Sequence, residues 1–207
     1  MPTTKHDTDI NISFYTDNAL KVAREYDSVS FEDVHGHWWN KLVDDKFTEK
    51  RLRILDVGAG SGRDSAFLLN QGHDVVAIEP SKGMQAHLLA KLPDLNVIAN
   101  PLPMEQNIQG KPFDLILLSA VWMHIRPEFR ERAFNWLENH LSKGGRLIIF
   151  LRHGPFSDGR KEHPVSADEI KAYALSHGLV LTTSNESEVD LLGRGEVFWE
   201  TVIISKH

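Results

Sequence analysis

Residues 54–65, ILDVGAGSGRDS, join a short apolar run to a glycine-rich turn. Gly58, Gly60 and Gly62 follow the run directly, and a helical pattern begins near Arg63. A strand, a glycine turn and a helix in this order let a ligand approach the bare backbone of the turn. The chemistry around the turn must therefore indicate which ligand it holds.

The turn does not match the known phosphate-binding patterns. Arg63 stands where a P-loop needs its lysine, and it also occupies the place of the last glycine or alanine in a dinucleotide fingerprint. Asp56 lies just before the first glycine, where a carboxylate would repel a pyrophosphate and attract an amino group. Glu79 ends the next apolar run, where it can accept hydrogen bonds from ribose hydroxyls. The two acids favour S-adenosylmethionine, which combines a ribose, an adenine and an amino-acid end without a phosphate.

The rest of the chain alternates between apolar runs and helical patterns, which predicts an α/β protein. A capping box at Ser166 and Glu169 begins the last predicted helix, and Gly178 ends it. We expect a Rossmann-like, doubly wound, seven-stranded sheet, mostly parallel, with a C-terminal antiparallel hairpin. Ligands bind beyond the carboxyl ends of the strands in such sheets. The predicted strands are 54–57, 73–79, 95–99, 113–120, 144–151, 179–183 and 197–204.

The 207 residues suit a single domain. We expect a polar tail over residues 1–14, a helical cap over 15–50 and the Rossmann-like core over 51–207. The chain contains no cysteine, which fits a reducing cytoplasm, and shows no signal peptide or apolar run long enough for a membrane span. Its formal net charge of −6 argues against a broad electrostatic contact with nucleic acid.

Three stretches together resemble the class I S-adenosylmethionine-dependent methyltransferases, in particular their bacterial small-molecule branch. They are ILDVGAGSGRDSAFLLNQGHDVVAIEPSKGM, FDLILLSAVWMHI and LSKGGRLIIF, and the resemblance covers roughly residues 50–205. It implies that the turn contacts the methionine end, that Glu79 binds the ribose and that the loop after the fourth strand lies under the sulfonium. The implied cofactor-binding residues are Asp56, Gly58, Gly60, Glu79, Pro80, Ser81, Met84, Ser119, Ala120 and Val121.

One position departs from the family pattern. Many relatives carry an acid after the third strand that reaches the adenine, whereas this chain has Asn100 there, so the amide or the backbone of Leu102 is expected to serve instead. By the same resemblance, Tyr15 and Tyr26 of the cap reach the carboxylate end of the cofactor.

The acceptor is expected between the cap and two loops at the ligand end of the sheet. His124 and His153 are the candidate catalytic residues, and the cationic loop after the fifth strand suits an anionic acceptor. The tryptophans could equally pack the core, His124 could be structural and the loop could be an ordinary solvated one. His35 and His37 face different ways on a helix, so no metal site is expected. The candidate acceptor-binding residues are Trp38, Trp122, Arg152 and His163.

These observations favour methyl transfer from S-adenosylmethionine to a small molecule by in-line displacement, leaving S-adenosylhomocysteine. Two alternatives stay open. The pairs Tyr26-Asp27 and His163-Pro164 match tRNA wobble-uridine methyltransferases, which would make RNA the acceptor. The domain could also be a non-catalytic cofactor-binding module. The sequence names neither the acceptor nor the methylated atom.

Overall fold

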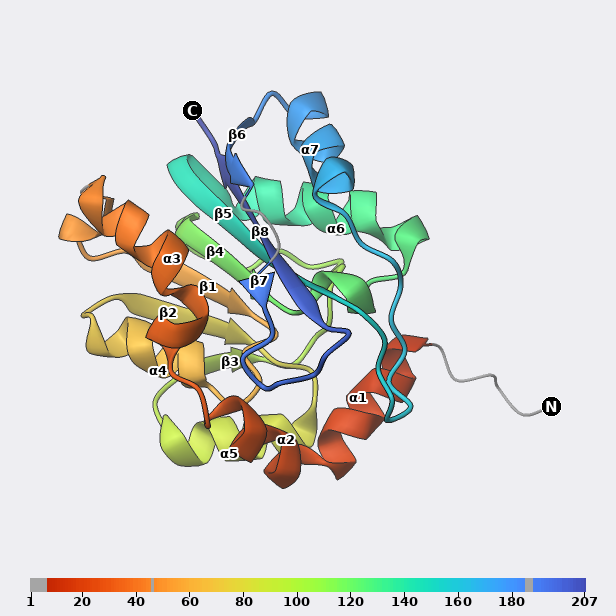
Figure 1. Ribbon diagram of the computed structural model, residues 1–207. Coiled ribbons are helices and arrows are strands. Elements are labelled where there is room, and N and C mark those ends of the chain that lie inside the picture. Colours follow the sequence, from red (N-terminus) through yellow and green to blue (C-terminus); the bar gives the residue numbers. More distant parts are fainter. Residues whose placement is uncertain (1–6, 46, 185–187) are drawn as a thin grey trace.

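The computed structural model describes residues 7–45, 47–184 and 188–207. One twisted sheet runs through the centre in the order β3-β2-β1-β4-β5-β8-β6, with the short β7 beside β8 (Figure 1). The strands are β1 (Arg53–Val57), β2 (Asp74–Ile78), β3 (Asn96–Ile98), β4 (Phe113–Ser119), β5 (Leu141–His153), β6 (Val180–Ser184), β7 (Glu188–Val189) and β8 (Phe198–Ser205).

The predicted topology is confirmed. The first five strands are parallel, and β8 is antiparallel to both β5 and β6, which gives the expected C-terminal hairpin. The strand order reverses between β1 and β4, because β2 and β3 extend the sheet on one side and β5 on the other. This reversal is where an open α/β sheet binds its ligand.

Helices cover both faces of the sheet (Figure 1). Neighbouring residues of a strand face opposite layers, so Leu55 packs with the layer of α6 and α7, and Ile54 with the layer of α3 and α4. The parts of β1, β4 and β5 that lie between these layers are consequently mostly apolar, as buried parallel strands require. The helices are α1 (Asp7–Asp17), α2 (Ala19–Tyr26), α3 (Phe31–Asp44), α4 (Arg63–Asn70), α5 (Lys82–Lys91), α6 (Pro127–His140) and α7 (Ala167–Ser176), with short 3-10 turns η1 (Phe47–Glu49) and η2 (Trp122–His124).

The helix starts follow the sequence signals. The Ser81 hydroxyl accepts a hydrogen bond from the Met84 amide at 3.3 Å, and the Ser166 hydroxyl accepts one from the Glu169 amide at 3.2 Å. The Glu169 carboxylate accepts a hydrogen bond from Arg130 at 2.8 Å. The acid of the predicted box therefore ties α7 to α6.

The predicted polar tail is wrong from residue 7 onward, where α1 begins; residues 1–6 lie outside the described part of the chain. The apolar residues Ile10, Ile12 and Phe14 alternate, and so give no helical signal. The helix is held instead by distant partners, because α1 contacts both α5 and η2. Within the described residues, no helix combines the length and the apolar character needed to cross a membrane.

Candidate active site

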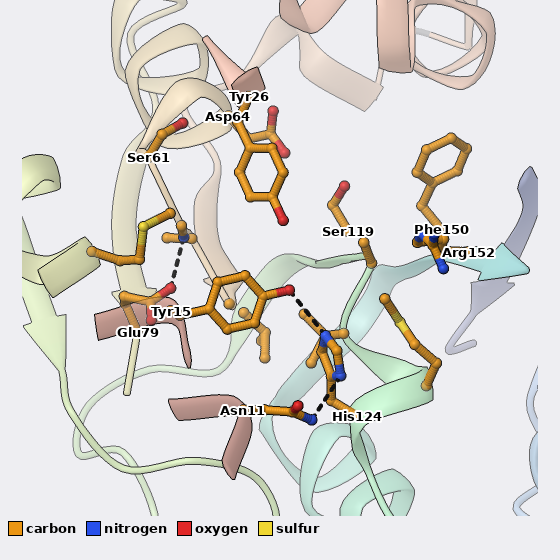
Figure 2. Close-up of a pocket in the computed structure, with 18 of the residues that line it drawn as sticks. Asn11, Tyr15, Tyr26, Ser61, Asp64, Glu79, Ser119, His124, Phe150 and Arg152 are labelled. Atoms are coloured by element: carbon orange, nitrogen blue, oxygen red, sulfur yellow. Dashed lines mark hydrogen bonds between the residues drawn. The ribbon is translucent and has the colours of Figure 1, made fainter. Parts of the chain in front are cut away.

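A cavity of about 240 Å³ lies at the carboxyl ends of β1, β2, β4 and β5, between the sheet and α1 (Figure 2). Most of the predicted cofactor-binding residues line it, although they come from several separate segments of the chain. Those that line it are Tyr15, Tyr26, Gly58, Gly60, Glu79, Pro80, Ser81, Met84, Leu102, Ser119, Ala120 and Val121.

The turn after β1 needs its glycines. Gly58 and Gly60 have φ values of 72° and 54°, in the left-handed region that glycine adopts without strain. A β-carbon on Gly58 would collide with the Val121 side chain, so the β1 turn and the loop after β4 come together only because this position is bare. Ala120 in that loop also has a positive φ of 57°, an unusual conformation for alanine.

Glu79, directly after β2, stabilises the same turn through hydrogen bonds to its backbone. Its Oε2 accepts the Gly60 amide and its Oε1 accepts the Ser81 amide, each at 2.8 Å (Figure 2 shows the first bond). Burial raises the pKa of Glu79 to about 6, against the lowering effect of the two backbone hydrogen bonds. An ionised carboxylate has about four acceptor positions, so two remain for ribose hydroxyls.

Asp56 does not line the cavity, although the sequence assigned it to the cofactor. It is buried under the turn and accepts a 2.6 Å hydrogen bond from the Ser65 hydroxyl. Burial, followed by the negative charge of Asp64, raises its pKa to about 7. The other aspartate near this turn, Asp64, does line the cavity, and the Nε of the neighbouring Arg63 donates to it at 2.7 Å. Both residues stand inside the opening stretch of sequence, but no motif distinguished them there.

His124 lies in the cavity wall, as predicted, with both ring nitrogens engaged. Nε2 is 3.1 Å from the Tyr15 hydroxyl and Nδ1 is 3.0 Å from the Asn11 amide nitrogen (Figure 2). Nδ1 also lies 3.0 Å from the Lys161 carbonyl oxygen. Burial lowers the pKa of His124 to about 4, so the ring is neutral at physiological pH. Arg160 also donates to the Tyr15 hydroxyl at 3.1 Å, which closes this side of the cavity.

Asn11 fastens α1 to the loop after β5. Its Oδ1 accepts the Lys161 amide and its Nδ2 donates to the Lys161 carbonyl, each at 2.8 Å. This two-way contact places Tyr15 over the cavity. Residues of α1, the end of α2 and the start of α3 line the cavity at the ligand edge, whereas the rest of α3 packs on the face of the sheet.

Of the three residues predicted at the end of β5 and in the loop after it, Arg152, His153 and His163, Arg152 lines the cavity and the other two do not. Successive side chains of a strand point to opposite faces, so Arg152 and His153 could not both face the ligand. His153 instead stacks on Phe198 at 4.3 Å between ring centroids and lies 3.3 Å from Glu200. The predicted catalytic position at His153 therefore lies outside the cavity wall.

Three further predicted residues are also placed elsewhere. Trp38 and Trp122 are fully buried in the two layers of the core, and Trp122 donates to Glu169 at 3.3 Å. His163 lies beyond the cavity lining, with its ring 3.5 Å from Asp7. Large aromatic side chains gain more from packing between helix and sheet than from a wet pocket wall, which explains the two tryptophans.

Sequence reasoning missed the segment that leads into β8. Asp190, Leu191, Leu192, Arg194 and Trp199 line the cavity beside Arg152. The Asp190 carboxylate accepts from Arg194 at 2.5 Å and from the Trp199 indole at 3.0 Å, which fixes this part of the wall. The segment follows a predicted hairpin strand and carries no recognisable motif, so only the structure reveals it.

The sheet order, the glycine turn and the acid after β2 together define a methyltransferase of the Rossmann-like class. The chain belongs to the class I S-adenosylmethionine-dependent methyltransferases. Residues 55–149 match a family described as a methyltransferase domain. An uncharacterised methyltransferase of Alkaliphilus oremlandii is 31% identical over 172 residues, which are 82% of this chain and 74% of that protein.

Solved structures share the fold. Magnesium protoporphyrin IX methyltransferase of Synechocystis PCC 6803, with bound S-adenosylhomocysteine, has a TM-score of 0.76 at 15% identity, over 98% of this chain and 100% of that one. The 1,6-didemethyltoxoflavin-N1-methyltransferase of Burkholderia thailandensis has a TM-score of 0.63 at 18% identity, over 90% and 88% of the two chains.

The residues present fit the cofactor S-adenosylmethionine. A buried carboxylate, Glu79, retains acceptor capacity for a ribose, and the apolar Met84 and Leu102 provide a surface for an adenine. Arg63 and Asp64 place opposite charges side by side, as the zwitterionic methionine end requires. When bound, the cofactor supplies a methyl group activated by its sulfonium.

Proposed function

We propose that the acceptor is a small molecule with an anionic group, and that Arg152 binds this group. The observation that carries the proposal is the state of three cavity-lining guanidinium groups. Arg160 is paired with Asp158 at 2.6 Å and Arg194 with Asp190 at 2.5 Å. Within the part of the chain that the structure describes, Arg152 donates only to the carbonyls of Gly154 and Pro155, at 2.6 and 3.1 Å.

Arg152 is thus a cation with spare donor capacity. Among the described residues its buried Nε has no hydrogen-bond partner, and no carboxylate pairs with it. Burial, followed by the charges of Arg194 and Arg160, lowers its pKa, which remains far above neutrality for a guanidinium. A carboxylate or phosphate of the acceptor would relieve the repulsion among these cations and satisfy the free donors.

The wall around Arg152 suits a small and partly apolar acceptor. Phe150 stacks on Trp199 with ring centroids 4.7 Å apart, and the Arg152 guanidinium lies 3.9 Å over the Phe156 ring. Residues from α1 and from the loop after β5 cover the cavity, which supports an enclosed ligand rather than a polymer. The two solved relatives described above are named for small-molecule acceptors.

Two observations weigh against the RNA alternative. The net charge is −6, whereas binding of an RNA backbone calls for a basic surface. Asp27, which supports the likeness to wobble-uridine enzymes, is bound on the surface by Lys91 at 2.8 Å.

The chain contributes positioning and exclusion of water. Glu79 and the glycine turn hold one end of the cavity, Arg152 orients the acceptor at the other, and Tyr15 covers the space between them. Since Tyr15, Asn11 and Lys161 occupy both ring nitrogens of His124, we assign it to positioning Tyr15. This replaces the expected role of His124 as a general base.

The test begins with a cell extract separated into RNA and small molecules, the latter divided further by anion exchange before the assay. Labelled S-adenosylmethionine should yield labelled product from an anionic small-molecule fraction. With that acceptor, Arg152→Met should raise KM by about 10- to 100-fold, the loss of one charge-assisted contact, with S-adenosylhomocysteine affinity unchanged. Arg132→Met, at an exposed site, is the control. Labelling confined to RNA, or an unchanged KM, would refute the proposal; no labelling in any fraction would favour a non-catalytic module.

A further inference from the structure

The buried side chain of His35 on α3 contacts two cavity-lining residues, Asp64 and Ser119, from behind the cavity wall. We propose that His35, held by Trp38, is a positioning residue that orients the Asp64 carboxylate toward the ammonium group of the cofactor. The inference concerns cofactor binding alone and does not depend on the identity of the acceptor.

The hydrogen-bond partners of His35 fix its tautomer. The ring is fully buried, and its Nδ1 lies 3.0 Å from the indole Nε1 of Trp38. An indole N–H can only donate, so Nδ1 must be the unprotonated acceptor. The hydrogen of the neutral ring is then on Nε2. A second proton on Nδ1 would face the indole hydrogen, and burial also lowers the pKa of His35.

The Nε2 hydrogen points at two cavity-lining groups. It lies 3.2 Å from Oδ2 of Asp64 and 3.2 Å from the Ser119 hydroxyl. Asp64 follows the β1 turn and Ser119 ends β4, so one imidazole connects the two strands that flank the reversal in strand order. The rings of Phe31 and Phe150 pack against His35 at centroid distances of 5.1 and 5.0 Å, which keeps the imidazole in place.

Asp64 is held at both oxygens. Arg63 Nε donates to Oδ1 at 2.7 Å and His35 donates to Oδ2, so the plane of the carboxylate is fixed while further acceptor positions remain. Burial opposes its ionisation, but the neighbouring charge of Arg63 and the bond from His35 outweigh this and lower the pKa of Asp64. Burial and the negative charge of Asp64 instead raise the pKa of Asp56, which lies behind it.

Asp64 is therefore the ionised acid at this end of the cavity, and Arg63 supplies the matching cation. A ligand with an α-ammonium and an α-carboxylate complements this pair, whereas an uncharged thioether nucleoside does not. A fixed carboxylate loses less entropy on binding than a mobile one, which is why the support from His35 matters for affinity.

The test compares three ligands by calorimetry: S-adenosylhomocysteine, its analogue without the amino group, and methylthioadenosine, which lacks the whole amino-acid end. His35→Phe keeps a buried ring but removes the donor to Asp64. We expect about a tenfold loss of S-adenosylhomocysteine affinity, the size of one charge-assisted hydrogen bond, and less than a twofold change for the other two ligands. Asp64→Asn should give the same pattern with a larger loss.

His37→Phe is the matched control, since it makes the same change two positions along α3 at a residue outside the cavity lining; all three affinities should be retained. If His35→Phe lowers the affinity for all three ligands equally, the role of His35 is purely structural. If it leaves the affinity for S-adenosylhomocysteine unchanged, His35 does not position Asp64. If His35→Phe does not fold, His35→Leu takes its place and is judged by the same outcomes, because it also removes the donor to Asp64.

Discussion

Replacing Glu79 by glutamine tests how the cofactor end of the site is built. The carboxylate uses one oxygen for the Gly60 amide and the other for the Ser81 amide, both at 2.8 Å. Glutamine offers one oxygen and one NH₂ group, so one of the two amides must face another donor. The substitution thus changes no volume but removes a hydrogen bond to a charged acceptor in a buried position.

The magnitude follows from that single lost bond. A hydrogen bond to a charged group contributes about 1.5–3 kcal/mol, so the free energy of unfolding should fall by about 2 kcal/mol. In a chain of this size such a loss lowers Tm by about 4–8 °C. The ribose hydroxyls also lose one charged acceptor, and S-adenosylhomocysteine affinity should therefore fall by about tenfold or more.

Two measurements separate these effects. Calorimetric unfolding gives the stability change, and titration with S-adenosylhomocysteine well below Tm gives the affinity of the folded protein. A less stable variant with unchanged affinity would show that Glu79 braces the turn without contacting the ribose. A variant with unchanged stability would contradict the hydrogen-bond geometry itself.

Three other outcomes are expected. Burial raises the pKa of Glu79 to about 6, and the ionised form is the better acceptor for ribose hydroxyls. The affinity of the wild type for S-adenosylhomocysteine should therefore decrease as the pH falls through 6. An affinity that does not change over this pH range would contradict the role of Glu79. Asn11→Ala removes both hydrogen bonds with Lys161, so S-adenosylhomocysteine should dissociate about fivefold faster or more in stopped-flow measurements. An unchanged dissociation rate would mean that α1 does not retain the ligand. Ala120→Gly relieves a left-handed backbone and should raise the free energy of unfolding by about 1 kcal/mol in denaturant titrations, whereas a loss of stability would show that the strain estimate is wrong.

The sheet was predictable because its strands carry a strong and local signal. The sequence stretches that form β1 and β4 are mostly apolar on both faces. Near the cofactor end, a glycine turn follows β1 and the helix cap Ser81 follows β2. The cofactor-binding set at Gly58, Gly60 and Glu79 was predictable for a related reason, since it depends on backbone shape and on the position where a strand ends.

Side-chain direction was less predictable. Asp56 and Asp64 flank the same turn, but Asp56 points beneath it and Asp64, in the first turn of α4, points into the cavity. The distance along the chain cannot distinguish them. The start of α1 could not be predicted either, because this helix depends on hydrogen bonds between Asn11 and Lys161, two residues that lie 150 positions apart in the sequence.

The walls of the cavity come from different parts of the chain. The turn after β1, the end of β2 and the start of α5 form the end proposed for the cofactor, whereas β5, its following loop and the segment entering β8 surround Arg152. Substitutions around Arg152 can therefore alter acceptor preference with little effect on the cofactor end. This division allows the C-terminal third of the chain to change without disturbing the geometry of the first half. Directed libraries aimed at new acceptors should accordingly sample positions 154–160 and 191–194 and leave residues 54–84 untouched.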